Sequence, residues 1–324
     1  MCWIYLIMPS KNLSAPKIKV IGVGGSGSNA ISRMMQCKIQ GIDLIALNTD
    51  TQDLVKTRAH QKFRIGKETT KGLGAGMNPE IGRRAAEESR EEIEQVLKGS
   101  DMVFITSGLG GGTGSGASSI VAEIAKKQGA LTIAVVTKPF SFEGNQRRSV
   151  AEKALRELKD KVDTLLIIPN DKILSLVNKD TTVISAFWIC DEVLREAVQG
   201  ISDLVVFPGI INVDFSHLKA IMKNSGPALF GIGYGKGEKR IEEAVDRVLN
   251  SPLLDFSIKG AKGILFNING GNDLSLEEIK TIANLITKNG SPKAKIIFGA
   301  VQDKRLAKGE IKITLIATGF NNDD

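Results

Sequence analysis

The residues with the clearest chemistry lie between Gly108 and Gly116, where six glycines, Thr113 and Ser115 follow a short apolar run. Glycine loses more backbone freedom on folding than any other residue, so this composition predicts a loop and not the interior of a helix or strand. Without side chains, successive backbone N–H groups can converge on one anion, and the positive end of a following helix adds to their field. The hydroxyls are further donors. The segment therefore predicts a phosphate-binding loop.

Two more glycine clusters follow the same logic. Gly22, Gly24 and Gly27 form G-x-G-x-x-G after an apolar run, and a third cluster, GLGAG, covers 72–76. The first motif alone also fits a nicotinamide dinucleotide site, and the 108–116 segment alone also fits a flexible linker. Because two of these loops each close a strand and open a helix, one nucleotide site with two glycine walls is the better interpretation. The 72–76 loop would then close over the terminal phosphate and respond to its loss.

Polar side chains that could complete such a site come from several segments. Asp50 ends an apolar run and could bind Mg²⁺ or simply cap a helix. Glu143 and Arg147 are four residues apart on one face of a predicted helix, a spacing that by itself favours a salt bridge between them. Asn170 could contact a base edge or cap a helix.

A further pair points to the base itself. Phe187 and Asp191 lie at i and i+4, on one face of a predicted helix. A ring can stack on a purine. A carboxylate can accept hydrogen bonds from guanine N1–H and N2–H₂, which adenine lacks, so Asp191 favours GTP over ATP.

The elements that must position these residues alternate along the chain. Apolar runs at 17–23, 43–47, 102–105, 130–137 and 164–168 are separated by helical patterns, among them 79–97 and 145–161. This order predicts an α/β fold with a Rossmann-like parallel sheet, whose ligands bind at the carboxyl ends of the strands. We expect an N-terminal extension (1–16), a nucleotide-binding domain (17–180), a long central helix (181–204), a break at 207–209, a second α/β domain (205–320) and a short tail (321–324).

Composition narrows the class of protein. The chain has 324 residues, 42% of them apolar, which excludes wholesale disorder. Three cysteines and two histidines show no metal-ligand spacing, which favours a reducing, cytoplasmic environment. The formal charge of +7 is spread over acidic and basic residues, so we expect no specific nucleic-acid binding. The apolar segment Cys2–Met8 is too short to span a membrane.

Several motifs together resemble the FtsZ family of the tubulin superfamily. They are GGGTGSG at 110–116, GVGGSGSNA at 22–30, PFSFEGNQR at 139–147, and IINVDFSHLKAIM at 210–222. The resemblance extends over about 18–320 and implies the tubulin/FtsZ architecture and a GTP or GDP site with Mg²⁺ at Asp50. The residues it implies for the nucleotide are Gly24, Gly25, Asn29, Ala75, Gly76, Gly110, Gly112, Thr113, Gly114, Thr137, Glu143, Arg147, Asn170, Phe187 and Asp191. Of these, Glu143 and Arg147 hold the ribose in the family. The segment Trp188–Cys190 (WIC) is more apolar than the family pattern.

The resemblance also implies how hydrolysis occurs. In the family, the segment that matches 210–222 is the synergy loop, which completes the catalytic site of the next subunit in a head-to-tail filament. Asn212 and Asp214 match its pattern, and His217 replaces its second acid. The expected function is a GTPase that polymerises with itself into the cell-division ring. The alternative is a GTP-binding scaffold with weak hydrolysis because of His217. A nicotinamide oxidoreductase is the third hypothesis.

Partners and location are also implied by the resemblance. We expect self-association, together with the membrane tethers and regulators of a division ring at mid-cell in the cytoplasm. The sequence stops six residues after Thr318, and the family's long linker and C-terminal binding peptide have no counterpart in it.

Overall fold

The computed structural model describes residues 15–174, 180–206, 210–211, 213–254, 257–303 and 305–320. Four of the sequence predictions therefore fall wholly or mainly outside the described residues. They are the N-terminal extension, the break at 207–209, Asn212 and the tail at 321–324.

Ten strands form one sheet with the order β3-β2-β1-β4-β5-β6-β7-β10-β8-β9. The strands are β1 (Ile18–Val23), β2 (Ile42–Asn48), β3 (Gln61–Arg64), β4 (Met102–Gly108), β5 (Leu131–Lys138), β6 (Thr164–Pro169), β7 (Gly226–Lys236), β8 (Gly263–Gly270), β9 (Lys295–Gln302) and β10 (Glu310–Thr318). Strands β1 to β6 are parallel, and β10 runs antiparallel to its neighbours β7 and β8. Strand β6 also pairs in parallel with β7, which joins the two parts of the sheet.

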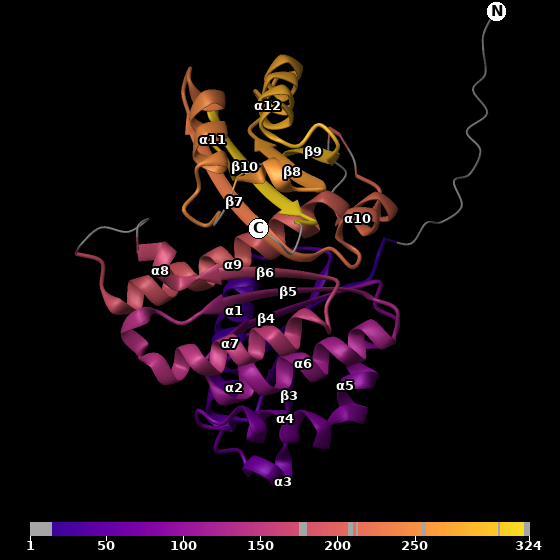
Figure 1. Ribbon diagram of the computed structural model, residues 1–324, viewed down its shortest axis with the longest axis vertical. Helices are drawn as coiled ribbons and strands as arrows, with labels where there is room; N and C mark the ends of the chain where they lie inside the picture. The colour runs from indigo at the N-terminus through magenta and orange to yellow at the C-terminus, as the bar shows by residue number, and fades with distance from the viewer. Residues whose placement is uncertain are drawn as a thin grey trace, which may run out of the picture.

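Helices cover both faces of the sheet. They are α1 (Gly24–Gln36), α2 (Thr51–Lys56), α3 (Lys67–Thr70), α4 (Pro79–Glu88), α5 (Arg90–Leu97), α6 (Gly112–Lys127), α7 (Asn145–Lys159), α8 (Asn170–Ile173), α9 (Val183–Val206), α10 (Phe215–Met222), α11 (Arg240–Leu249) and α12 (Leu276–Asn289). A 3₁₀ turn, η1 (Ser141–Glu143), precedes α7. Figure 1 shows α9 lying between the parallel strands and the C-terminal strands.

The alternation of side chains along each strand explains these layers. On β1, Val20 packs into a core with α1, α9 and α10, whereas Ile21 packs into a core with α4 to α7. A third core lies between the C-terminal strands and helices α11 and α12. The predicted architecture is confirmed: a Rossmann-like parallel sheet, a long central helix and a second α/β part. The domain boundaries given above stay a prediction.

Three local predictions were wrong or incomplete. The loop expected over 108–116 is confined to 109–111, because Gly108 ends β4 and the glycines from Gly112 onward lie in the first turns of α6. The helix expected over 79–97 is two helices, because the chain turns at Ser89, whose hydroxyl accepts a hydrogen bond from the backbone N–H of Gly66 at 3.1 Å. A tertiary contact of this kind leaves no trace in the local sequence. The short elements β3, α2, α3 and α10 were not predicted. Among the described residues, no helix has the length and apolar character needed to cross a membrane.

Candidate functional site

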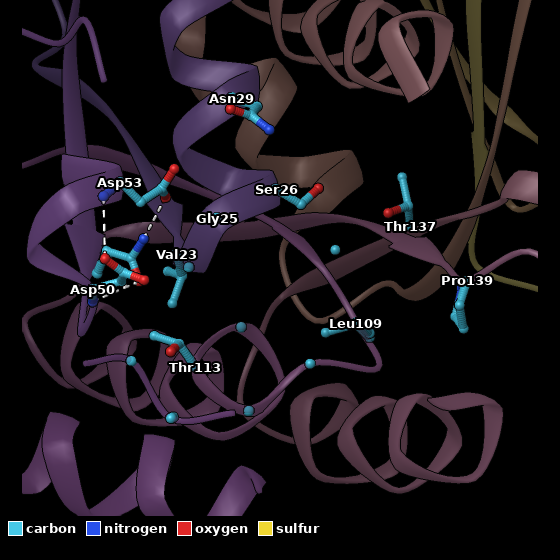
Figure 2. Close-up of a pocket in the computed structure, with 18 of the residues that line it drawn as sticks. Val23, Gly25, Ser26, Asn29, Asp50, Asp53, Leu109, Thr113, Thr137 and Pro139 are labelled. Atoms are coloured by element: carbon cyan, nitrogen blue, oxygen red, sulfur yellow. Dashed lines mark hydrogen bonds between the residues drawn. The ribbon is translucent and has the colours of Figure 1, made fainter. Parts of the chain in front are cut away.

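The parallel strands end at a cavity of about 600 Å³. It is lined by residues that follow β1, β2, β4, β5 and β6 and by one turn of α9, which is the crevice where open α/β sheets bind ligands. The predicted residues that line it are Gly24, Gly25, Asn29, Asp50, Ala75, Gly76, Gly112, Thr113, Gly114, Thr137, Glu143, Arg147, Asn170, Phe187 and Asp191. Segments far apart in sequence therefore share one cavity (Figure 2).

The three glycine loops touch one another through their backbones. A Cβ on Gly24 would lie 2.9 Å from the nitrogen of Gly114, and the φ of Gly24 is +72°. The N–H of Gly112 donates to the carbonyl of Gly76 at 2.8 Å. Only glycine allows this closeness at Gly24, because a side chain would strain the backbone and collide with the next loop. The loops thus form one continuous wall of main chain.

Gly110 and Ser115, which were predicted to face a phosphate, do not line the cavity. The N–H of Gly110 donates to the hydroxyl of Ser115 at 2.9 Å. Ser115 is buried. Both residues shape the loop from within. The hydroxyl that faces the cavity is that of Thr113, which also shares a 2.6 Å hydrogen bond with the hydroxyl of Thr49.

Two carboxylates form one wall of the cavity (Figure 2). The Oδ1 of Asp50 accepts hydrogen bonds from the backbone N–H groups of Gln52 and Asp53, at 2.8 and 3.2 Å, so Asp50 does cap α2. Asp53 accepts a 2.6 Å hydrogen bond from Asn48, and burial together with the nearby Asp50 raises its pKa. Asn48 and Asp53 were missed as site residues, although Asn48 closes the strand that leads to Asp50.

These donors suit Mg²⁺. Magnesium is usually held by one or two carboxylates together with substrate phosphates and water. Capping uses Oδ1 of Asp50, and Oδ2 of the same carboxylate lies toward Gly74 in the 72–76 loop. Among the described residues no group of three or more histidine, cysteine or acidic side chains could hold a metal ion. A cation here would therefore depend on a phosphate ligand.

Another side of the cavity carries Glu143 and Arg147, which pair with each other as their spacing predicted. Glu143 accepts from Arg147 at 2.5 Å and from the backbone N–H of Phe140 at 2.9 Å. Asn170 is 5% exposed, and its Oδ1 has no hydrogen-bond partner among the described residues. Pro169 occupies the cap position of α8, so Asn170 does not cap this helix. A buried amide oxygen without a partner is costly, and a donor on a bound ligand would satisfy it.

The remaining side of the cavity is formed by α9. Phe187 is 40% exposed, and its ring meets that of Phe140 edge to face, with centroids 5.3 Å apart. Burial raises the pKa of Asp191 to about 6, against the opposing effect of Arg33. Cys190, which was not predicted, also lines the cavity, and burial raises the pKa of its thiol to about 12. The thiol is therefore neutral.

Asp214 and His217 lie outside this cavity. Both are exposed on α10, where Asp214 caps the helix by accepting from the N–H of Ser216 at 2.7 Å. That hydrogen bond lowers the pKa of Asp214. Figure 1 shows α10 at the right and α8 at the left, with α9 between them. At 1.5 Å per residue, the part of α9 from Asp191 to its end spans about 20 Å.

The geometry has a clear chemical meaning. Backbone N–H groups and a helix N-terminus suit an anion, two carboxylates suit its magnesium, and a ring beside a buried carboxylate suits a purine with N–H donors. A cavity with all three fits a nucleoside di- or triphosphate.

Comparison with known proteins agrees with this conclusion. Residues 17–178 match the model of the Tubulin/FtsZ family, GTPase domain, and residues 226–321 match that of the FtsZ family, C-terminal domain. The structure of an FtsZ dimer from M. jannaschii is 48% identical, covers 94% of this chain and 89% of its own, and superposes with a TM-score of 0.91.

Two structures from Haloferax volcanii share the fold at lower identity. The GDP-bound monomer of CetZ1 is 22% identical, with a TM-score of 0.78 over 94% of this chain and 95% of its own. The GTPgS-bound protofilament of CetZ2 is 20% identical, with a TM-score of 0.77 over 94% of each chain. The two family models and the 48% identity over nearly the whole length decide the assignment: the chain belongs to the FtsZ family of the Tubulin/FtsZ GTPases.

Proposed function

We propose that this chain binds GTP with Mg²⁺ in the cavity described above and hydrolyses it only when a second copy docks head to tail. The observation that carries the proposal is the separation of two halves of a site. The cavity gathers the residues that we assign to the nucleotide, while exposed Asp214 caps α10, which Figure 1 shows on the opposite side of α9 from α8. An acid so placed can act on the nucleotide of another subunit but not on its own.

We assign the residue roles from the family resemblance, for residues that line the cavity. Gly24, Gly25, Gly112 and Gly114 face the phosphates with backbone N–H groups, and Ala75 and Gly76 close over the terminal phosphate. Glu143 and Arg147 hold the ribose, Asn29, Asn170 and Phe187 contact the base, and Asp191 accepts from guanine. Thr113 and Asp50 reach the magnesium ion, and Thr137 lines the wall beside the sugar. Domains 17–180 and 205–320, joined by the helix at 181–204, are the units of this arrangement.

Head-to-tail docking has a structural consequence. Such a contact is heterologous, and when its rotation does not close it generates a filament. The related proteins are described as a dimer from M. jannaschii and a protofilament from Haloferax volcanii. In this proposal the filaments build the cell-division ring in the cytoplasm at mid-cell, with membrane tethers and regulators as further partners.

Phosphate release measured against protein concentration, in GTP and magnesium, tests the proposal. Specific activity should rise steeply with concentration, because each active site needs two subunits. A flat specific activity would contradict trans activation. Competition between GTP, ATP and NAD in the same experiment separates this proposal from an oxidoreductase.

A mixing experiment makes the test sharper. Asp191→Ala should disable the pocket, and Asp214→Ala should disable the docking acid. Each variant alone is expected to be inactive, whereas a mixture recovers activity at contacts that combine the intact halves. No recovery, although both variants are folded, would contradict the two-subunit site.

A second candidate function rests on His217. This residue is exposed on the first turn of α10, beside Asp214, and its backbone N–H donates to the backbone carbonyl of Asp214 at 3.0 Å. A neutral imidazole brings no negative charge, and a protonated one would bind phosphate. The chain would then be a filament-forming GTP-binding scaffold with weak hydrolysis. His217→Asp should raise turnover severalfold at unchanged GTP affinity; no gain would remove this candidate.

A further inference from the structure

We propose that Arg33 is a positioning residue for guanine recognition, held over the ring of Trp188 so that the carboxylate of Asp191 stays charged and directed at the base. This inference rests on the proposed GTP site. It goes beyond that site by assigning a role to two side chains that contact each other beside Asp191, Arg33 from α1 and Trp188 from the apolar segment WIC of α9.

The contact geometry supports the assignment. Arg33 Nε lies 3.6 Å from Asp191 Oδ2, and the two side chains are 18% and 12% exposed. The guanidinium carbon of Arg33 lies 4.4 Å from the ring centroid of Trp188. Arg33 Nε is buried without a hydrogen-bond partner among the described residues, so the carboxylate and the ring are its stabilising neighbours. A guanidinium on an aromatic face loses little freedom when it pairs with a carboxylate.

A second cavity explains why the ring is needed. This cavity, of about 410 Å³, shares Asn29, Phe187 and Asp191 with the nucleotide cavity and is lined on its other side by Arg33 and Trp188. Asp191, together with Asn29 and Phe187, thus separates the two cavities. A guanidinium facing open solvent would be screened, and the ring of Trp188 covers one face of it. The Arg33–Asp191 ion pair is therefore partly shielded from water, and the charge of Arg33 acts more strongly on the Asp191 carboxylate than it would in bulk solvent.

The electrostatics give the pair a function. Burial pushes the pKa of Asp191 up to about 6, and Arg33 is the charged group on the facing helix α1 that pulls it down. The adjacent titratable group on α9, Cys190, is a neutral thiol. Without Arg33 the pKa of Asp191 would rise further, and part of the carboxylate would be protonated near neutral pH. A protonated carboxyl donates where guanine N1–H and N2–H₂ need an acceptor.

Equilibrium binding of GTP and ATP to the wild type, Arg33→Gln and the control Gln36→Ala tests the inference. Gln36 is exposed on the same helix and lines the same second cavity. Arg33→Gln should weaken GTP binding by about tenfold at pH 7, a size typical of coupling between contacting groups. The loss should shrink at pH 8.5, where Asp191 is ionised again. ATP binding and the control should not change. Equal losses for both nucleotides, or no loss, would overturn the inference.

Asp191→Asn separates positioning from mere structural support. An amide at this position should favour XTP, because xanthine carries a carbonyl where guanine has its amino group. Arg33→Gln should then cost little XTP affinity in the Asp191→Asn background, because no carboxylate remains to be held. A tenfold loss there as well would show that Arg33 acts through the fold, against the proposal.

Trp188→Leu covers the case in which Arg33→Gln does not fold, because Trp188 is 49% exposed. It should lower GTP affinity severalfold with the same pH dependence, whereas Trp188→Phe should retain most of it. Unchanged affinity in Trp188→Leu would overturn the role of the ring. Failure of the wild type to bind GTP would overturn the proposed function itself, whereas normal wild-type binding with no effect of Arg33→Gln overturns this inference alone.

Discussion

Gly82→Ala is predicted to destabilise the chain and to weaken nucleotide binding, although Gly82 lies inside helix α4, where alanine is the better helix former. Gly82 is buried against the segment 108–116, which we propose binds phosphate and here call the phosphate loop. A Cβ built on it would lie 2.3 Å from the carbonyl oxygen of Gly112 and 2.9 Å from the Cα of Thr113. Helix α4 therefore supports the loop through direct contact between backbones.

The magnitude follows from two opposing effects. Replacing glycine by alanine in a helix interior stabilises by about 0.8–1 kcal/mol. Relieving a carbon–oxygen contact of 2.3 Å requires a shift of about 1 Å, and overpacking of this kind costs about 1–3 kcal/mol. Because the atoms in the way are backbone and not a flexible side chain, the upper part of that range applies, and the net loss should be about 1–2 kcal/mol. The same shift moves N–H groups of the phosphate loop, so GTP affinity should fall by about tenfold or more.

Urea unfolding and equilibrium binding of GTP measure the two effects. The matched control is Arg84→Ala, two residues along the same helix at an exposed position, which should change stability by less than about 0.5 kcal/mol and leave GTP affinity alone. Stabilisation of Gly82→Ala by about 1 kcal/mol, with normal GTP affinity, would mean that helix propensity decides and that the helix does not support the loop.

Three further predictions concern single side chains. Asp50→Asn should keep the cap of α2 but lose most of the magnesium dependence of GTP binding. Asp50→Ala should lose this dependence too and, because the cap is gone, should also cost about 1 kcal/mol of stability in urea unfolding. If the magnesium titration is unaltered in both variants, Asp50 does not bind the metal. Thr113→Val leaves the buried hydroxyl of Thr49 without its 2.6 Å partner and should cost about 1–3 kcal/mol by the same measurement; wild-type stability would contradict this. Burial raises the pKa of Asp203 to about 6 in the folded state, above its unfolded value near 4. Because the folded state then binds the proton more tightly than the unfolded state does, the wild type should lose stability as the pH rises from about 4 to about 6. Asp203→Asn should lack that part of the loss, and parallel pH profiles of the two proteins would contradict the assignment.

The sequence was most informative where a residue type had few alternative uses. The glycines of 108–116 marked the turn from strand to helix, although only 109–111 is loop and α6 already begins at Gly112. The parallel strands had to bring this turn together with Gly24 and Asp50. The sequence was least informative about the direction in which a group points and about contacts between residues far apart along the chain. Nothing in the order of residues tells that Gly110 and Ser115 bond to each other and turn away from the cavity. Likewise, Arg33 could not be assigned to Asp191 before the fold placed α1 beside α9, because the two residues are far apart along the chain.

The way in which the central helix α9 is anchored determines which part of the molecule can respond to a change of bound nucleotide. Helix α9 shares its core with the parallel strands and with β7, β8 and β10. Its buried Glu196 also accepts from the Tyr234 hydroxyl at 2.5 Å and pairs with Lys312 at 4.0 Å. A helix fixed on both sides moves only with both parts of the sheet. The 72–76 loop is held by backbone hydrogen bonds from Gly112 to Gly76 and from Thr51 to Gly72, and none of its residues belongs to the three hydrophobic cores. Loss of a terminal phosphate should therefore act first on this loop, at the surface that the proposed second subunit covers.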